Sequence, residues 1–284
     1  MRRILVTGVN GQLGSELKVL LNNEEAFEVT YLSRAELSLE KTEEIISILS
    51  KYNPELIIHC AAYTAVDKAE SEIELADKIN HLACKEIAQY CKSNDCRLIS
   101  ISTDYVFDGN SSIALSEKAS VDPLNIYGKT KLLGEEATQR ICPDSIIIRT
   151  SWVYSSYGNN FVKTMIRLMK EREEISVIND QIGSPTYAKD LAKAILKIIK
   201  SDNWVAGIYH YSNDAEISWY DFAEEIKKIK GYGTKINPIP TSSYPTPAKR
   251  PKFSLLDKSK IQNTYKVNVP FWKDSLKEMI NLLN

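Results

Sequence analysis

Short apolar runs alternate with segments of helical periodicity through the first half of this 284-residue chain. Each run has the length of a β-strand, and the run at residues 55–62 is almost wholly apolar, as is typical of a strand buried on both faces of a parallel sheet. Parallel strands joined by helices require right-handed crossovers, and the usual solution is an α/β fold with a Rossmann-like doubly wound parallel sheet. The predicted strands span residues 2–8, 28–33, 55–62, 97–103 and 145–152, and the predicted helices span residues 11–23, 40–52, 69–93 and 126–140.

Composition and charge exclude several classes of protein. Lysine and arginine total 36 against 37 aspartate and glutamate residues, which leaves no basic excess for neutralising nucleic-acid phosphates. No apolar stretch approaches the roughly 18 residues that span a bilayer. Only three apolar residues lie between Arg3 and Thr7, fewer than the ~7 that a secretory signal peptide needs, and the five cysteines contain no CxxC pair. We therefore expect a cytoplasmic protein with reduced cysteines and with no membrane or nucleic-acid partner.

A glycine-rich turn follows the first predicted strand. The string TGVNGQLG (7–14) places three glycines at intervals of three residues, between a strand and a helix. Backbone N–H groups of such a turn can approach a pyrophosphate closely, and the helix amino terminus adds a favourable dipole. The alternative is a turn that needs glycine for steric reasons alone. The context predicts dinucleotide binding by Gly8, Asn10, Gly11, Gln12, Leu13 and Gly14.

The end of the second predicted strand bears on the choice between NAD and NADP. An acidic residue at this position usually binds the ribose 2′-hydroxyl and repels a 2′-phosphate. Here Ser33 and Arg34 occupy the position, and the first acidic residue is Glu36. We expect Ser33 and Arg34 to bind the 2′-phosphate of NADPH. A solvated Arg34, and the use of NADH as a second cofactor, are the alternatives.

A tyrosine and a lysine follow the fourth predicted strand. Tyr127 and Lys131 lie four residues apart in a predicted helix and therefore share one helix face. A neighbouring ammonium group lowers the pKa of a phenol, which is ordinarily about 10. The fourth strand ends at Thr103, at the edge where open α/β sheets bind ligands. We expect Thr103, Tyr127 and Lys131 to form the catalytic group.

Longer motifs carry a resemblance to a known family. The strings STDYVFDG (102–109), PLNIYGKTKLLGE (123–135) and INDQIGSPT (178–186) resemble those of the dTDP-4-dehydrorhamnose reductases, which are extended short-chain dehydrogenases/reductases. The string SYPTPAKRPKFSLLD (243–257) extends the resemblance toward the carboxyl terminus. It implies NAD(P)H-dependent reduction of the C4 ketone of dTDP-4-dehydro-L-rhamnose to dTDP-L-rhamnose. In that reaction Tyr127 supplies a proton, Thr103 hydrogen-bonds the carbonyl oxygen, and Lys131 lowers the pKa of Tyr127 and holds the nicotinamide ribose.

The resemblance and the positions in the chain together assign further site residues. Small residues after the third strand permit close approach of the dinucleotide. Asn80 matches an asparagine of the family; the alternative for Asn80 is a helix cap or a surface position. Loop capping for Asp104 and core packing for Tyr105 and Trp152 are the alternatives to contact with the sugar. The remaining predicted cofactor contacts are Ala61, Ala62 and Tyr63, and the predicted substrate contacts are Thr103, Asp104, Tyr105, Trp152 and Arg250.

Arg250 lies in a proline-rich stretch of the chain: five of the ten prolines fall between residues 238 and 251. Its guanidinium suits the substrate diphosphate, and an ion pair that pins the loop is the alternative. We expect an NAD(P)-binding Rossmann domain with the catalytic residues at 1–155. A smaller mixed α/β substrate domain is expected at 156–284, with some segments returning to the core.

One position departs from the family pattern. Some members bind magnesium at a dimer interface through carboxylates, one of them in the helix after the SPT string. In this chain Lys189 precedes Asp190, although Glu16 is present. Lysine cannot bind magnesium, which requires oxygen ligands. We therefore predict no metal ligand, while a homodimer stays open.

Two other functions share parts of this pattern. A sugar-nucleotide 4,6-dehydratase has the same fold, cofactor and tyrosine–lysine pair, but it needs two carboxylates after the threonine, and the second position here is Tyr105. The regulatory subunit of methionine adenosyltransferase resembles the same family and works as a binding partner. The intact set of Thr103, Tyr127 and Lys131 favours catalysis by reduction.

Overall fold

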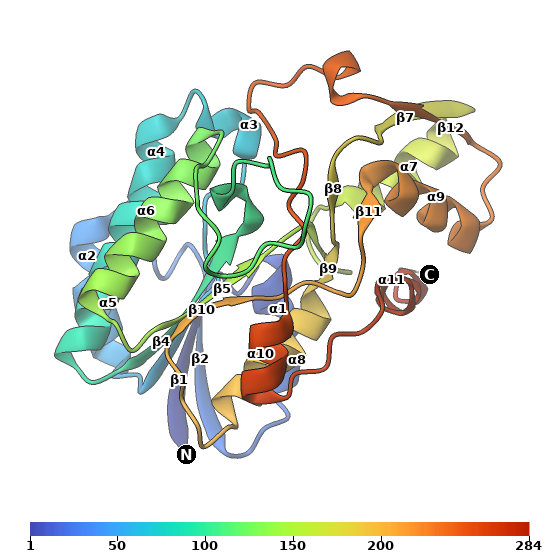
Figure 1. The fold of residues 1–284 in the computed structure, drawn as a ribbon. Coiled ribbons are helices and arrows are strands. Elements are labelled where there is room, and N and C mark those ends of the chain that lie inside the picture. Colours follow the sequence, from blue (N-terminus) through green and yellow to red (C-terminus); the bar gives the residue numbers. More distant parts are fainter. Residues whose placement is uncertain (284) are drawn as a thin grey trace.

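A six-stranded parallel sheet forms the centre of the computed structural model, which describes residues 1–283 (Figure 1). Its spatial order is β10-β5-β4-β3-β1-β2, so the direction of strand addition reverses between β1 and β3. The five predicted strands are present, and β10 joins them from the second half of the chain. The strands are β1 (Arg2–Thr7), β2 (Phe27–Leu32), β3 (Leu56–His59), β4 (Arg97–Thr103), β5 (Ile146–Thr150) and β10 (Gly207–His210).

Helices cover both faces of this sheet (Figure 1). Strand β1 shows why: Ile4 and Val6 pack into one apolar layer, whereas Leu5 packs into the other. Since successive side chains of a strand point to opposite faces, an all-apolar strand needs a cover on each side. The predicted fold class is confirmed. One face is covered by α1 (Gln12–Leu21), α8 (Ala188–Ile199) and α10 (Ser259–Tyr265), and the other by α2 (Thr42–Tyr52), α5 (Ala83–Ser93) and α6 (Ile126–Ile141).

The single helix expected at residues 69–93 is wrong in detail. A short helix, α3 (Val66–Ala69), ends before a turn, and the helix that follows runs through α4 (Ile73–Asp77), a π-helical segment (Lys78–Leu82) and α5. Asn80 lies in the π segment, and its buried side chain hydrogen-bonds the backbone N–H and carbonyl of Tyr63, at 2.9 and 3.1 Å. The π segment thus holds the loop after β3, and such segments are frequent at functional sites.

A second hydrophobic cluster, here termed the distal core, lies beyond the carboxyl ends of the sheet (Figure 1). Its strands pair only in twos: β12 with β7, β11 with β8, and β6 with β9. Its buried aromatic residues include Tyr154, Phe222 and Trp272. The elements are β6 (Val153–Tyr154), α7 (Phe161–Glu171), β7 (Glu174–Ile178), β8 (Ile182–Gly183), β9 (Thr186–Tyr187), β11 (Ile217–Ser218), α9 (Trp219–Lys230), β12 (Lys235–Ile239) and α11 (Trp272–Asn281).

Segments after residue 155 contribute to both cores. Strand β10 belongs to the sheet and helices α8 and α10 pack against it, whereas the other elements of that half build the distal core. Residues 1–155 and 156–284 are therefore not two contiguous folding units, because segments after residue 155 return to the sheet. Within residues 1–283, no helix has the length and apolar character needed to cross a membrane.

A buried ion pair fixes α6 on the sheet. The guanidinium of Arg149, on β5, donates three hydrogen bonds of 2.7–3.1 Å to the carboxylate of Glu135, on α6. Both side chains are 3% exposed. Helix α6 also carries Tyr127 and Lys131. The ion pair therefore helps to determine where these two residues lie relative to the strand ends.

Replacing Glu135 with alanine should lower the free energy of unfolding by about 3–5 kcal/mol, because Arg149 would remain charged and buried without its partner. The exposed pair of Glu171 with Arg167 offers a matched control, and Glu171→Ala should cost less than about 1 kcal/mol. Urea denaturation followed by circular dichroism measures both changes. Equal losses in the two variants would contradict the role given to the buried pair.

Candidate active site

A cleft of about 830 Å³ opens at the carboxyl ends of the parallel strands. It lies where the strand order reverses between β1 and β3, which is the position at which open α/β sheets bind ligands. The glycine turn and the residues after β2–β5 form one wall. The opposite wall includes Gly158 and Trp219, which come from the second half of the chain. The cleft is therefore shared between the sheet and the distal core.

The glycine turn leaves the amino terminus of α1 open to a ligand. Gly8 has a φ of 70°, and a Cβ atom there would lie 2.7 Å from the backbone nitrogen of Ala61. A Cβ atom on Gly14 would collide with the carbonyl oxygen of Gly8, so Gly14 lets α1 pack against the turn and does not itself line the cleft. The chemistry of this turn fits a pyrophosphate. The predicted turn residues that line the cleft are Gly8, Asn10, Gly11, Gln12 and Leu13.

Ser33 and Arg34 lie at the far end of the cleft, and both already have carboxylate partners. The backbone N–H and the hydroxyl of Ser33 donate to Glu36, while the exposed guanidinium of Arg34 pairs with Glu40. The sequence places no acidic residue directly at the end of β2, but the turn brings Glu36 back to it. A 2′-phosphate would take the place of these carboxylates as the partner of Ser33 and Arg34.

The loop after β3 forms the middle of the cleft. Ala61, Ala62 and Tyr63 all line it. The backbone of Tyr63 is held by Asn80, whose amide also donates to the hydroxyl of Thr130 on α6 at 3.2 Å. Asn80 is thus a buried residue that joins the loop to the helix carrying Tyr127. It is neither a helix cap nor a surface residue.

The predicted catalytic hydroxyls meet in the cleft. The Thr103 hydroxyl donates to the carboxylate of Asp104 at 3.0 Å and accepts from the backbone N–H of Tyr105 at 3.1 Å. It also hydrogen-bonds the phenol of Tyr127. A carboxylate, a hydroxyl and a phenol therefore form one hydrogen-bonded chain at the end of β4.

The pKa of Tyr127 is raised to about 12, chiefly because the phenol is buried; its hydrogen bond with Thr103 lowers the pKa, and Asp104 raises it. The expected lowering by Lys131 is absent from the structure. Instead, the buried Lys131 ammonium donates to the carbonyl of Ile101 at 2.7 Å. Burial therefore sets the pKa without an opposing contribution from Lys131, and the phenol keeps its proton at neutral pH.

The residues expected to contact the sugar surround this chain of hydrogen bonds. Burial raises the pKa of Asp104 to about 6, while Ser254 donates to its second oxygen at 2.6 Å. The ring of Tyr105 meets the ring of Tyr127 edge to face, with centroids 5.7 Å apart. Trp152 lies beyond β5, which ends at Thr150, two residues earlier than predicted, and its ring lines the cleft.

Arg250 is the one predicted substrate contact that does not line the cleft. Its guanidinium donates to both carboxylate oxygens of Asp67, on α3, at 3.0 and 2.7 Å, and to the hydroxyl of Thr246. The pKa of Asp67 is lowered mainly by this pairing. The contact corresponds to the structural alternative, in which Arg250 pins its proline-rich segment to α3.

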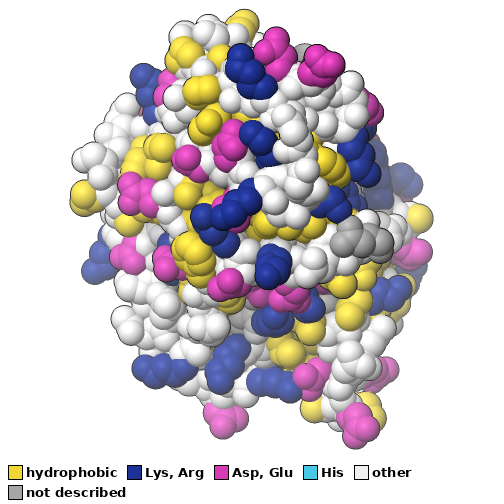
Figure 2. Space-filling model, turned by 90° about the vertical axis from the view of Figure 1, so that its right-hand side faces the viewer, with side chains coloured by type: hydrophobic (Ala, Val, Ile, Leu, Met, Phe, Trp, Pro, Cys, Tyr) yellow, Lys and Arg dark blue, Asp and Glu magenta, His cyan; other side chains and the backbone are white. Residues whose placement is uncertain are grey.

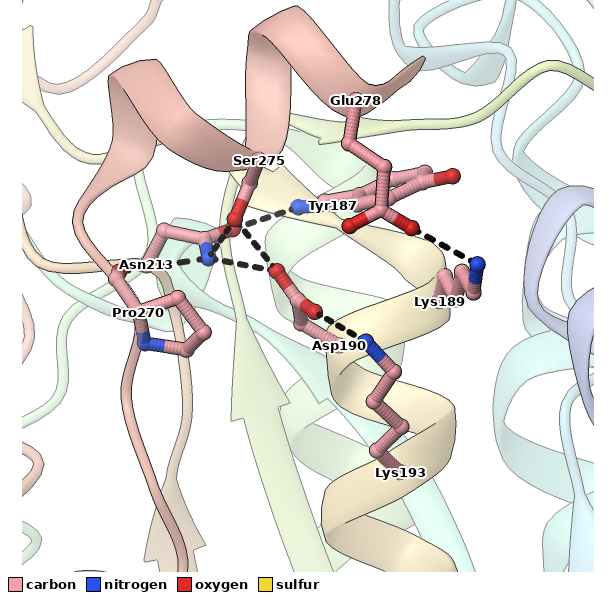
Figure 3. A network of polar contacts seen from close by, with 8 residues as sticks. All are labelled: Tyr187, Lys189, Asp190, Lys193, Asn213, Pro270, Ser275 and Glu278. Carbon is pink, nitrogen blue, oxygen red and sulfur yellow. Dashed lines mark hydrogen bonds and ion pairs between the residues drawn. The ribbon is translucent and has the colours of Figure 1, made fainter. Parts of the chain in front are cut away.

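The residues at the family's magnesium position do not fit a metal ion. Figure 3 shows the Lys189 ammonium beside the carboxylate of Glu278, on α11, with 2.6 Å between nitrogen and oxygen. Asp190 accepts from Lys193, Asn213 and Ser275 (Figure 3). Ser155 donates to Glu16 at 2.5 Å. Protein donors already satisfy these carboxylates, and an ammonium stands where an oxygen ligand would be needed.

Adding magnesium chloride or EDTA should therefore leave the melting temperature of the protein unchanged. A magnesium site saturated at a hundredfold excess over its Kd would stabilise the folded state by about 2.7 kcal/mol, a shift of several degrees. Differential scanning fluorimetry of one sample in both solutions decides the matter. A drop in melting temperature with EDTA that magnesium restores would contradict the fit described for Lys189.

Several residues that line the cleft were not predicted. Gly158, Asn159, Leu191 and Trp219 reach it from the second half of the chain. Asn160 links this wall to the glycine turn, because its amide donates to the side chain of Gln12 at 2.9 Å. These residues could not be found from the sequence because no spacing rule relates them to the strand ends.

Comparison with known proteins agrees with this geometry. The RmlD substrate binding domain family matches residues 1–284. The dTDP-4-dehydrorhamnose reductase of Escherichia coli K12 is 42% identical over 99% of this chain and 97% of its own length. The enzyme of that name from Aggregatibacter actinomycetemcomitans is 40% identical over 98% of each chain.

Solved structures give the same result. The dTDP-4-dehydrorhamnose reductase of Clostridium acetobutylicum is 42% identical and superposes with a TM-score of 0.95 over 99% of each chain. The reductase of Bacillus anthracis in complex with NADP is 39% identical, with a TM-score of 0.94 over 99% of this chain and 100% of that one. This chain belongs to the RmlD substrate binding domain family.

Proposed function

We propose that this protein catalyses the reaction named in its relatives, the NAD(P)H-dependent reduction of dTDP-4-dehydro-L-rhamnose. The product is dTDP-L-rhamnose, and the step is the last in the biosynthesis of that sugar nucleotide. The observation that carries the proposal is the meeting of Thr103 and Tyr127 with the glycine turn in one cleft. Full-length relatives named for this activity support it.

NADPH is the proposed cofactor, and it supplies the hydride when bound. The turn at Gly8 and Gly11 would hold its pyrophosphate, and Ser33 with Arg34 would hold the 2′-phosphate. A relative solved with NADP, 39% identical to this chain, supports this choice. Glu36 and Glu40 compete for the same donors, so use of NADH as well is compatible with the site.

The proton for the new hydroxyl would come from Tyr127. Hydride transfer to C4 leaves negative charge on the former carbonyl oxygen, and donors aimed at that oxygen stabilise it. A phenol with a pKa of about 12 is protonated throughout the neutral range and can act as the acid. Thr103 would hydrogen-bond the same oxygen, and Lys131, held by the Ile101 carbonyl, would contact the nicotinamide ribose.

Reduction fits the site better than elimination does. The residue after Asp104 is Tyr105, whose phenol packs on Tyr127, so the cleft has no second carboxylate at that position. Burial raises the pKa of Tyr105 above its ordinary value, so the phenol of Tyr105 is neutral. A 4,6-dehydratase would need a base at this point, and Tyr105 is a poor one.

We place the enzyme in the cytoplasm, where nucleotide sugars and NADPH are available to it. Its five cysteines are all free, and four of them are buried, which fits a reducing compartment. The resemblance leaves a homodimer open, and light scattering during gel filtration tests it.

Tyr127→Phe should lower kcat by about 10² or more, because the general acid is lost while the ring and its packing remain. Folding and NADPH binding should be unaffected. Tyr244→Phe is the matched control, since Tyr244 is exposed and lies outside the cleft. Steady-state kinetics with dTDP-4-dehydro-L-rhamnose measures both, and near wild-type turnover of Tyr127→Phe would remove Tyr127 from the acid role.

Arg34→Ala should raise the KM for NADPH by tenfold or more without changing the KM for NADH. A hydrogen bond to a charged group contributes about 1.5–3 kcal/mol, and the 2′-phosphate is the group that distinguishes the two cofactors. Kinetics with each cofactor at saturating sugar nucleotide gives both constants. Equal changes for the two cofactors, or none, would mean that Arg34 does not bind the 2′-phosphate.

A further inference from the structure

Trp152 has a backbone conformation that a large side chain rarely adopts. Its φ is 48°, in the left-handed region. Three other non-glycine residues between positions 1 and 283 have positive φ, and Asn53 and Lys266 among them simply terminate helices. For a bulky residue this conformation costs free energy and persists only where the surroundings enforce it. The contacts of Trp152 therefore need to account for it.

The main contact is a stack between two indole rings. The ring of Trp219 lies against that of Trp152, with centroids 3.7 Å apart and an angle of 16° between the planes. Gly183, on β8, leaves room for the same ring: a Cβ atom there would lie 3.0 Å from Cζ2 of Trp152. The Trp152 carbonyl accepts a hydrogen bond from the backbone N–H of Thr186 at 3.2 Å. Trp152 is thus held at its ring and at its backbone.

Trp219 is itself held firmly. It is the first residue of α9, directly after Ser218, which caps the helix together with Asp221 in a capping box. Phe161 packs on the Trp219 ring with 4.7 Å between centroids, and both rings pack against the distal core. A capped helix end and an aromatic neighbour leave this indole little freedom. The distal core therefore determines where the stacked pair lies.

Both indoles line the cleft that contains Thr103 and Tyr127. They bring two aromatic side chains to a cleft that also contains the hydroxyls of Thr103 and Tyr127 and the carboxylate of Asp104. Such a wall suits the C–H groups and the methyl group of a 6-deoxy sugar. A hydroxyl at C6 would lose its hydration against the rings without gaining a partner, which is unfavourable.

We propose that Trp219 is a positioning residue for the sugar substrate. It holds Trp152 in the left-handed conformation, and the stacked pair orients the apolar face of the 6-deoxyhexose so that its ketone meets Tyr127. The identity of the sugar rests on the proposed function. The stack itself does not depend on it.

Three variants test the proposal. Trp219→Leu removes the stack but keeps an apolar side chain, and Trp219→Phe keeps a ring and should recover part of the loss. Trp272→Phe is the matched control, because Trp272 packs on Phe222 in the distal core and does not line the cleft. Two closely stacked indoles give a circular dichroism couplet, which Trp219→Leu should abolish and Trp272→Phe should retain.

The kinetic expectation is a fall of about 10- to 100-fold in kcat/KM for the dTDP-sugar in Trp219→Leu, because a small displacement of the reacting groups has a cost of this size. The Kd for NADPH and the activity of Trp272→Phe should stay unchanged.

Normal kcat/KM in Trp219→Leu after loss of the couplet would overturn the inference, as would an equal loss of affinity for NADPH. Absence of the couplet in the wild-type protein would also overturn it. If the wild-type protein shows the couplet but does not reduce the dTDP-sugar, the proposed function fails and the sugar assignment of the wall fails with it. If the wild-type protein reduces the dTDP-sugar and Trp219→Leu has the same kcat/KM, the inference is wrong and the proposed function stands.

Discussion

Apolar side chains on both faces of the parallel strands leave the ends of the sheet as the place where a ligand can reach the strand backbone. In this protein the strand order reverses between β1 and β3, so the loops after these strands diverge and a cleft opens between them. Everything proposed for the site depends on this geometry. The glycine turn, Thr103 and Trp152 come from different strand ends and meet only because the strands are parallel and their register is fixed.

The sheet side of the cleft could be predicted from local patterns. A strand followed by glycines and a helix indicates a phosphate turn, and Tyr127 and Lys131 lie four residues apart, which is helical spacing. The rest depends on contacts between distant segments. Asp67 and Arg250 are 183 residues apart, so their ion pair has no sequence signal. Likewise, the stack of Trp152 on Trp219 depends on tertiary packing. The hydrogen bond between Ser33 and Glu36 depends on the geometry of the turn that joins them.

The balance of charge and burial around Tyr127 also could not be read from spacing. Helical spacing places Lys131 near the phenol, but the direction of the lysine side chain is set by the carbonyl of Ile101, with which it hydrogen-bonds. Burial then dominates the pKa of the phenol and raises it to about 12. The phenol is therefore fully protonated at neutral pH, as a proton donor must be.

The central claim is that this cleft directs hydride to C4 of a dTDP-linked 4-ketosugar. The most direct measurement uses NADPH carrying deuterium at the transferable position, with dTDP-4-dehydro-L-rhamnose as substrate, and examines the product by NMR. The account predicts dTDP-L-rhamnose with a single deuterium at C4 and none at any other carbon. Unchanged ketosugar, or a product with deuterium at another position, would contradict it.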